Sequence, residues 1–213
     1  MVKNKRIVYF ISSILVFVLF IAFSYIVLTD ILNQVDFNLT VKIQDFTPLS
    51  FDTYFSTLSL LGNIETYVFL LILIVILRKR LRGLLTLIIF GCVHIIEIVG
   101  KGLLYHPGPP FMFFRYNLDF LLPSTYIKPG FSYPSGHSLR ISFISVFLIY
   151  LILKNKKINT FLKLVIVFLI GSFTLLMLYS RVSLGEHWTS DVIGGLLLGA
   201  SGALLAISVD KSY

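Results

Sequence analysis

The stretch IVYFISSILVFVLFIAFSYIVL, residues 7–28, decides the fold of this chain because it is long, apolar and free of charged residues. About 20 helical residues are enough to cross a hydrocarbon core of roughly 30 Å. The rest of the 213-residue chain has the same character, being 57% hydrophobic and only 13% charged, with a mean hydropathy of +0.92. Soluble globular domains do not have this composition, so the sequence predicts an integral-membrane protein.

Six apolar segments can be drawn along the chain, at about residues 7–28, 58–77, 84–104, 138–153, 161–179 and 191–209. They predict an all-α fold, a polytopic bundle of six transmembrane helices that forms a single integral-membrane domain over residues 1–213. The second segment is expected to be irregular at its outer end, because Gly62, Asn63 and Glu65 interrupt its first turns. The first segment is expected to be retained, since it is longer than the apolar core of a signal peptide and no A-x-A-like cleavage site follows it.

Lysine and arginine set the expected orientation. They gather before the first segment, between the second and third, between the fourth and fifth, and after the last at Lys211. Short cytoplasmic loops are rich in these residues, so both termini of this multi-pass cell-membrane protein are expected in the cytoplasm and connections 29–57, 105–137 and 180–190 outside. The formal net charge of +8 then reflects topology and contact with anionic membrane lipids, and nucleic acid is not expected as a partner.

Charged and polar residues also collect at the expected outer helix ends, where they are costly and usually functional. In the segment SRVSLGEHWTSD, residues 180–191, a helix that begins near Glu186 or His187 would place His187 and Asp191 on one face, four residues apart. Asp191 could then accept from one ring nitrogen and leave the other free as a nucleophile. The helix N-terminus would attract an anion.

Two further segments supply groups suited to phosphate. In YPSGHS, residues 133–138, Ser135 and Gly136 could present a hydroxyl and backbone N–H groups, and His137 could act as a general acid. Lys101 would donate to phosphate as a point charge, and Arg181 as a planar fork. Taken singly, these features could be a buried polar pair, a helix cap and a snorkelling lysine. Their convergence on one membrane face, without metal-ligand spacing, favours a site that acts on phosphate.

The residues match a known family. Ser-Arg-x5-His-x3-Asp is complete at residues 180–191, and Pro-Ser-Gly-His is complete at residues 134–137. The chain resembles the type 2 phosphatidic acid phosphatase family, whose site is shared with vanadium haloperoxidases. The resemblance implies a phosphohistidine at His187, orientation of His187 by Asp191, protonation of the leaving group by His137, and phosphate binding by Lys101, Ser135, Gly136 and Arg181. It implies no metal and no cofactor.

One position departs from the family pattern. The family's first motif is Lys-x6-Arg-Pro, but Gly108 stands seven residues after Lys101, so a phosphate-binding arginine is missing. His106, Arg115 or Arg140 could supply the lost charge, and His106 is the first choice because it is two residues away. A turn histidine without a role is the alternative.

The role of Glu97 can be interpreted in two ways, since it shares a helix face with His94 and Lys101. The simpler interpretation is a buried pair with one of these neighbours. The sharper hypothesis is that Glu97 positions Lys101.

The leading functional hypothesis is metal-independent dephosphorylation of a lipid phosphate or diphosphate in the outer leaflet, with undecaprenyl diphosphate, phosphatidic acid or phosphatidylglycerophosphate as candidate substrates. A phosphotransferase with the same phosphohistidine is an alternative. A transporter or a degenerate, inactive family member is a more remote one, because the charges gather at one face, apart from His94 and Glu97, and do not cross the membrane midplane.

Overall fold

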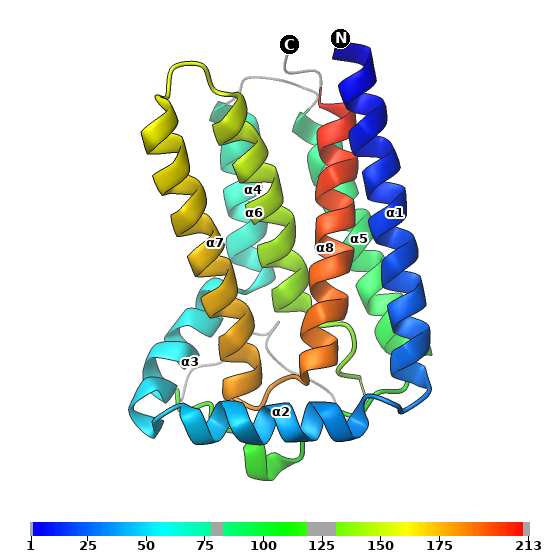
Figure 1. Cartoon of the computed structure of the whole chain (residues 1–213), viewed down its shortest axis with the longest axis vertical. Coiled ribbons are helices and arrows are strands. Elements are labelled where there is room, and N and C mark those ends of the chain that lie inside the picture. The colour runs from blue at the N-terminus through cyan, green and yellow to red at the C-terminus, as the bar shows by residue number, and fades with distance from the viewer. Residues whose placement is uncertain (1, 78–82, 119–130, 211–213) are drawn as a thin grey trace.

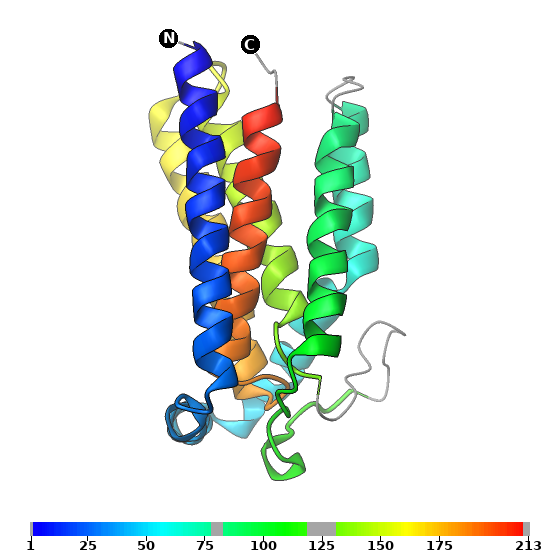
Figure 2. The ribbon, with the colours of Figure 1, turned by 90° about the vertical axis from the view of Figure 1, so that its right-hand side faces the viewer.

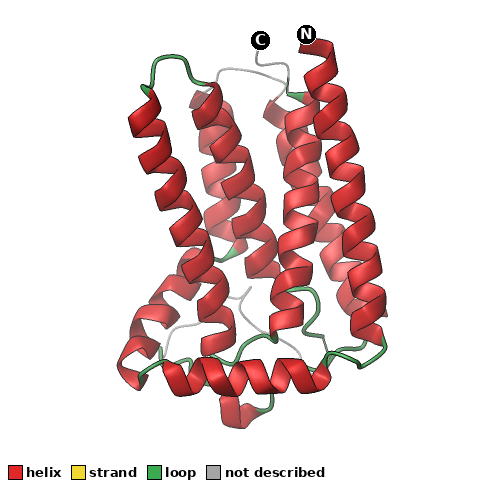
Figure 3. Ribbon diagram, viewed as in Figure 1, coloured by secondary structure: helices red, strands yellow, loops and turns green. Residues whose placement is uncertain are grey.

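The structure is a computed structural model that describes residues 2–77, 83–118 and 131–210. Over these residues the chain is helical, and Figure 3 shows helices joined by loops. The elements are α1 (Val2–Leu28), α2 (Asn33–Phe46), α3 (Asp52–Leu61), α4 (Ile64–Leu77), α5 (Gly83–Leu103), α6 (Gly136–Lys154), α7 (Thr160–Ser183) and α8 (Thr189–Val209), with short 3-10 turns at Leu49–Phe51 and Phe111–Phe113.

Five of these helices, α1, α5, α6, α7 and α8, are long and apolar enough to cross a membrane. The predicted second span is a bent pair, Leu49–Leu61 and Ile64–Leu77, whose halves differ in direction by 50°. The break falls at Gly62 and Asn63, where irregularity was expected. The all-α multi-pass prediction is therefore confirmed, with five spans, or six if the bent pair counts as one.

The helix α2 was not predicted. Residues 29–57 were treated as an outer connection, yet Asn33–Phe46 forms a helix that lies across the end of the bundle, roughly perpendicular to the long helices (Figures 1 and 2). It is too short and too polar to be found in a search for spans. It exposes apolar residues such as Val35, Phe37 and Phe46, as expected of a helix that lies in a membrane interface.

The core is centred on α6 and α8, whose backbones approach closely. A Cβ at Gly195 would overlap the carbonyl oxygen of Ser135, and one at Gly199 would overlap the carbonyl oxygen of Leu139. Small residues allow such packing where apolar burial from water does not drive association. This contact joins the start of α6 to the start of α8, so the Pro-Ser-Gly-His motif and the Ser-Arg-x5-His-x3-Asp motif lie side by side.

Both termini lie at one end of the bundle, and α2 and α3 lie at the other (Figures 1 and 2). Two chain ends on the same side require an even number of membrane crossings, which agrees with six spans if the bent pair counts as one. The basic residues of 78–82 and Lys211, which contributed to the predicted orientation, lie outside the described residues. Cytoplasmic termini and an outward site remain predictions.

Candidate active site

The turn between α7 and α8 sets the position of His187 and Asp191. Gly185 adopts a left-handed φ of +66° and packs so closely on the carbonyl of Phe113 that a Cβ would overlap it. Helix α8 begins at Thr189, so the expected start near residue 186 or 187 was wrong and His187 precedes the helix. The two side chains meet nevertheless, because Asp191 in the first turn folds back and accepts from the Trp188 N–H at 2.9 Å.

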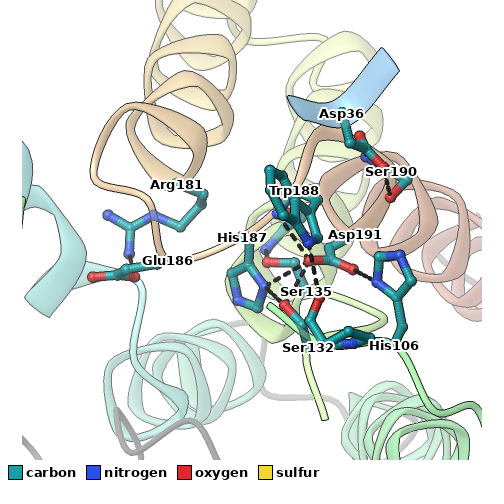
Figure 4. Close-up of polar contacts among 12 residues, drawn as sticks. Asp36, His106, Ser132, Ser135, Arg181, Glu186, His187, Trp188, Ser190 and Asp191 are labelled. Carbon is teal, nitrogen blue, oxygen red and sulfur yellow. Dashed lines mark hydrogen bonds and ion pairs between the residues drawn. The ribbon is translucent and has the colours of Figure 1, made fainter. Parts of the chain in front are cut away.

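Asp191 is fully buried and is the centre of a hydrogen-bond network (Figure 4). Its carboxylate also accepts from Ser132 Oγ at 2.6 Å, His106 Nδ1 at 3.0 Å and His187 Nδ1 at 3.4 Å. A buried carboxylate is costly unless its oxygens are satisfied, and these donors satisfy it.

The order of donors fixes the tautomer of His187. Ser132 has one hydroxyl proton, which it donates to Asp191. Ser132 Oγ must therefore accept from His187 Nδ1, which lies 3.0 Å away. Because the proton of neutral His187 is then on Nδ1, its Nε2 carries a lone pair, as a nucleophile requires.

His106 has a different partner from the one expected. It was the first choice for a phosphate ligand, but it is buried and its Nδ1 donates to Asp191. Burial by itself would lower the pKa of His106, yet the hydrogen bond and negative charge of Asp191 outweigh burial and raise it. The structure thus assigns its Nδ1 to the aspartate that holds His187.

Gly108, which replaces the family arginine, lies beside Ser132. A Cβ at Gly108 would come within 3.3 Å of Ser132 Oγ. The two segments are held together by a hydrogen bond from Ser132 N–H to the His106 carbonyl at 3.0 Å. The absence of a side chain at residue 108 therefore leaves room for the serine that orders the His187 network.

The YPSGHS segment packs against α8 at the start of α6. The Ser135 N–H donates to the Asp191 carbonyl at 3.0 Å, and its hydroxyl accepts weakly from Ser138 N–H at 3.4 Å, so both groups have protein partners. His137 is buried, and its Nε2 lies 3.2 Å from the Ser59 carbonyl. Gly136 lacks a side chain where Glu97 and Arg140 approach, since a Cβ there would overlap the Glu97 carboxylate.

Arg181 shares Ser59 with His137. Its guanidinium is fully buried and donates to Ser59 Oγ at 2.6 Å and to Glu186 at 2.5 Å. Ser59 lies in α3 and belongs to neither motif. Its carbonyl contacts His137 and its hydroxyl contacts Arg181, so it brings these two motif side chains together. Figure 4 shows Arg181 and Glu186 on the opposite side of His187 from His106.

The remaining cations have distinct partners. Lys101 donates to Glu97 at 2.8 Å, in agreement with the expected pair on one face of α5. Arg140 donates from Nε to the Gly62 carbonyl at 2.8 Å and lies 3.4 Å from His137 Nδ1. Arg115 donates to Asp52 and to the carbonyl oxygens of Gln44 and Thr47 at the end of α2, which makes it a structural residue of the loop.

Asp36 of α2 is the contact that sequence reasoning missed most completely. Its carboxylate is buried and accepts from both the N–H of Ser190, at 2.9 Å, and the Ser190 hydroxyl, at 2.6 Å. Ser190 is the neighbour of Asp191 in the first turn of α8. The sequence around Asp36 contains no pattern that predicts a contact with Ser190, which lies far away along the chain.

Within residues 2–77, 83–118 and 131–210, no three His, Cys, Asp or Glu side chains are arranged to hold an ion. Fold and site together define a multi-pass helical membrane protein with a buried histidine–aspartate centre at one end of the bundle. The chain belongs to the PAP2 superfamily, whose sequence model matches residues 82–212.

Two curated relatives are similar over part of their length. A phosphatidylglycerophosphatase B of Bacillus subtilis (strain 168) is 32% identical over 138 residues, which cover 62% of this chain and 63% of the relative. An undecaprenyl-diphosphatase of Sulfolobus acidocaldarius is 28% identical over 144 residues, 66% of this chain and 61% of the relative. The aligned regions thus span less than two thirds of either relative.

Two solved structures share the fold. The transmembrane PAP2-type phosphatidylglycerolphosphate phosphatase of Bacillus subtilis superposes with a TM-score of 0.73 at 23% identity, covering 92% of this chain and 94% of that one. LpxE of Aquifex aeolicus gives a TM-score of 0.61 at 22% identity, covering 80% of this chain and 93% of that one.

Proposed function

We propose that this protein dephosphorylates a membrane lipid phosphate or diphosphate through a phosphohistidine at His187. The observation that carries the proposal is the order of hydrogen bonds from His187 to Ser132 and Asp191, which leaves Nε2 unprotonated. A lone pair held rigidly beside buried cationic groups is suited to attack on phosphorus.

In the proposed reaction, His187 Nε2 forms a bond to phosphorus while the bond from phosphorus to the lipid-side oxygen breaks. A protonated His137 gives its proton to that oxygen. Water then attacks the phosphohistidine, its proton passes to His137, and the P–N bond breaks to release phosphate. Asp191 keeps its charge throughout and stabilises the phosphorylated imidazolium that forms when His187 Nε2 bonds to phosphorus. Neutral His187 is regenerated when the P–N bond breaks.

The cationic residues would neutralise the phosphoryl oxygens in this scheme. Arg181 already donates to Ser59, Glu186 and Ser180, so it would offer its one remaining Nη2 hydrogen and its positive charge. Lys101, held by Glu97, would offer a point charge. Ser135, through its hydroxyl proton, and Gly136, through its backbone N–H, would complete the proposed phosphate site. These charges supply what a metal ion supplies elsewhere, so we expect turnover to persist in EDTA.

The position of the site at one end of the helix bundle and the names of the relatives support the proposed substrate class. One relative is named for phosphatidylglycerophosphate and another for undecaprenyl diphosphate. Together with phosphatidic acid, these are the candidate substrates. We propose that they are taken from the outer leaflet, the side favoured by the distribution of basic residues.

The test is phosphate release from these three lipids in detergent with EDTA, comparing wild type, His187→Ala and the exposed-site control Tyr105→Phe. Phosphate should be released by wild type and the control, and lost in His187→Ala. Rapid alkaline quenching with labelled substrate should find the label on His187. Release that continues in His187→Ala, or label on another residue, would refute the mechanism.

A further inference from the structure

An apolar groove of about 390 Å³ runs along the membrane-spanning part of the bundle beside the candidate site. Its floor is α6, from Ile141 to Leu148, and its walls are the first turns of α4 and the middle of α7. Apart from Thr66, Ser145 and the ring of Tyr67, its lining consists of leucine, isoleucine and phenylalanine. Ser145 is bound to Thr174, which leaves the groove almost without polar groups to offer.

The helix break between α3 and α4 joins this groove to the site. Ser59, in the last turn of α3, contacts both His137 and Arg181, and Leu61, two residues later, lines the groove. Gly62 packs so tightly on the His137 ring that a Cβ would overlap Cδ2. The groove therefore begins within one turn of helix from the candidate general acid.

Asn63, at the same break, is a buried polar side chain without a partner. It is fully buried, and neither atom of its amide has a hydrogen bond within the described part of the chain. A buried amide left unpaired costs about 1–3 kcal/mol, so such a group in a native protein calls for a ligand or another explanation. Along the chain it lies between Gly62, which packs on His137, and Thr66, which lines the groove.

We propose that the groove binds the hydrocarbon tail of the lipid substrate and that Asn63 binds the polar linkage between tail and phosphate. This inference rests on the proposed function. Ile141 to Leu148 is a rise of about 10 Å along α6, so the groove would hold the first part of a tail, with the rest in the bilayer. A partner helix would instead require a seam of small residues, which bulky leucine and isoleucine walls do not provide.

The test compares two bulky substitutions on α4. Thr66→Trp fills the groove, and Val68→Trp, two residues away at a partly exposed position outside it, is the matched control. Each variant is assayed on a long-tailed lipid phosphate and on a soluble aryl phosphate. Thr66→Trp should lower kcat/KM for the lipid by roughly tenfold or more, the scale on which apolar pockets discriminate by single methylenes, and leave the soluble substrate within about twofold. Val68→Trp should change neither.

A binding measurement separates this proposal from the proposed function. A lipid phosphate with a photoreactive group in its tail should label the groove-lining parts of α6 and α7 in both wild type and His187→Ala. The label should be lost in Thr66→Trp and kept in Val68→Trp. Labelling that is unchanged by Thr66→Trp, or an equal loss of turnover with the lipid and the soluble substrate, would refute the proposal that the groove binds the tail. If no substrate were turned over but the groove were still labelled, the proposed phosphatase activity would be refuted and tail binding in the groove would be supported.

Discussion

Replacement of Asp36 by alanine is expected to disable the site from a helix that contains none of the motif residues. Asp36 accepts two hydrogen bonds from Ser190, at 2.9 Å and 2.6 Å, and lies near the N-terminus of α8. Hydrogen bonds to a charged group contribute about 1.5–3 kcal/mol each. Burial disfavours the charged carboxylate and raises the pKa of Asp36, although the hydrogen bonds from Ser190 lower the pKa again in part. The cost of burying the charge therefore cancels part of the stabilisation that the two bonds provide.

The net cost of Asp36→Ala is therefore about 2–4 kcal/mol in the docking of α2 on α8, close to a lost helix cap plus a lost charge at a helix N-terminus. The consequence for turnover is larger than the consequence for folding. Ser190 precedes Asp191, and a shift of about 1 Å in reacting groups can cost roughly 10²-fold in rate. We expect kcat to fall on that scale while KM changes little, because tail and phosphate contacts remain.

The assay measures kcat, KM and the thermal unfolding midpoint for Asp36→Ala, Asp36→Asn and Asp45→Ala. Asp45 is an exposed aspartate on the same helix, so its replacement removes the same charge without touching α8. Asp36→Asn keeps one acceptor and should fall between wild type and alanine. If Asp36→Ala matched Asp45→Ala in kcat, or if KM alone rose, the positioning argument would be refuted.

Three other changes have definite outcomes. Ser132→Ala removes the donor to Asp191 and the acceptor for His187, so kcat should fall by about 10²-fold with the fold intact by thermal unfolding, and an unchanged kcat would contradict the tautomer argument. His106 has a raised pKa in the folded state, so its stabilising contribution is complete below the unfolded value of about 6.5 and is lost as pH rises through the folded value. The difference in unfolding midpoint between wild type and His106→Gln should accordingly shrink as pH rises, whereas a constant difference would count against the His106–Asp191 bond. Asn63→Leu removes a buried unpaired amide and should raise the unfolding midpoint while lowering kcat/KM for the lipid, a combination that packing alone does not produce.

The membrane helices could be predicted because a span leaves a strong local signal. Length and the absence of charge located five helices and the irregular start of the second segment. Helix α2 carries a weaker signal, since its apolar residues are mixed with polar ones that face water or the bundle. Its direction across the bundle end depends on packing against α7 and α8, which no local pattern contains.

The site residues were found through their spacing, but their partners were not. Lys101 with Glu97 is a local pair, four residues apart on one helix, and was expected. Ser132 with Asp191 and Asp36 with Ser190 join residues far apart in the chain, and serine in a loop predicts no particular contact. His106 was expected at phosphate because a missing charge suggests the nearest replacement, whereas the fold brings its Nδ1 to a buried carboxylate.

Part of the site lies outside residues 82–212, the region that the family model matches. The reason is that the motif residues are held by partners from the first helices. The motifs supply groups of fixed chemistry, yet a buried histidine, arginine or aspartate needs partners for its remaining polar atoms. Ser59 of α3 supplies them to His137 and Arg181, and Asp36 of α2 supplies them to the turn that carries Asp191. Any short polar residue that reaches the right point can serve as such a partner, so the packing of the first helices decides which residue does. The α3–α4 break also carries Asn63 and part of the groove lining. We therefore expect substitutions at this break to change lipid preference, although the residues that act on phosphate lie elsewhere in the chain.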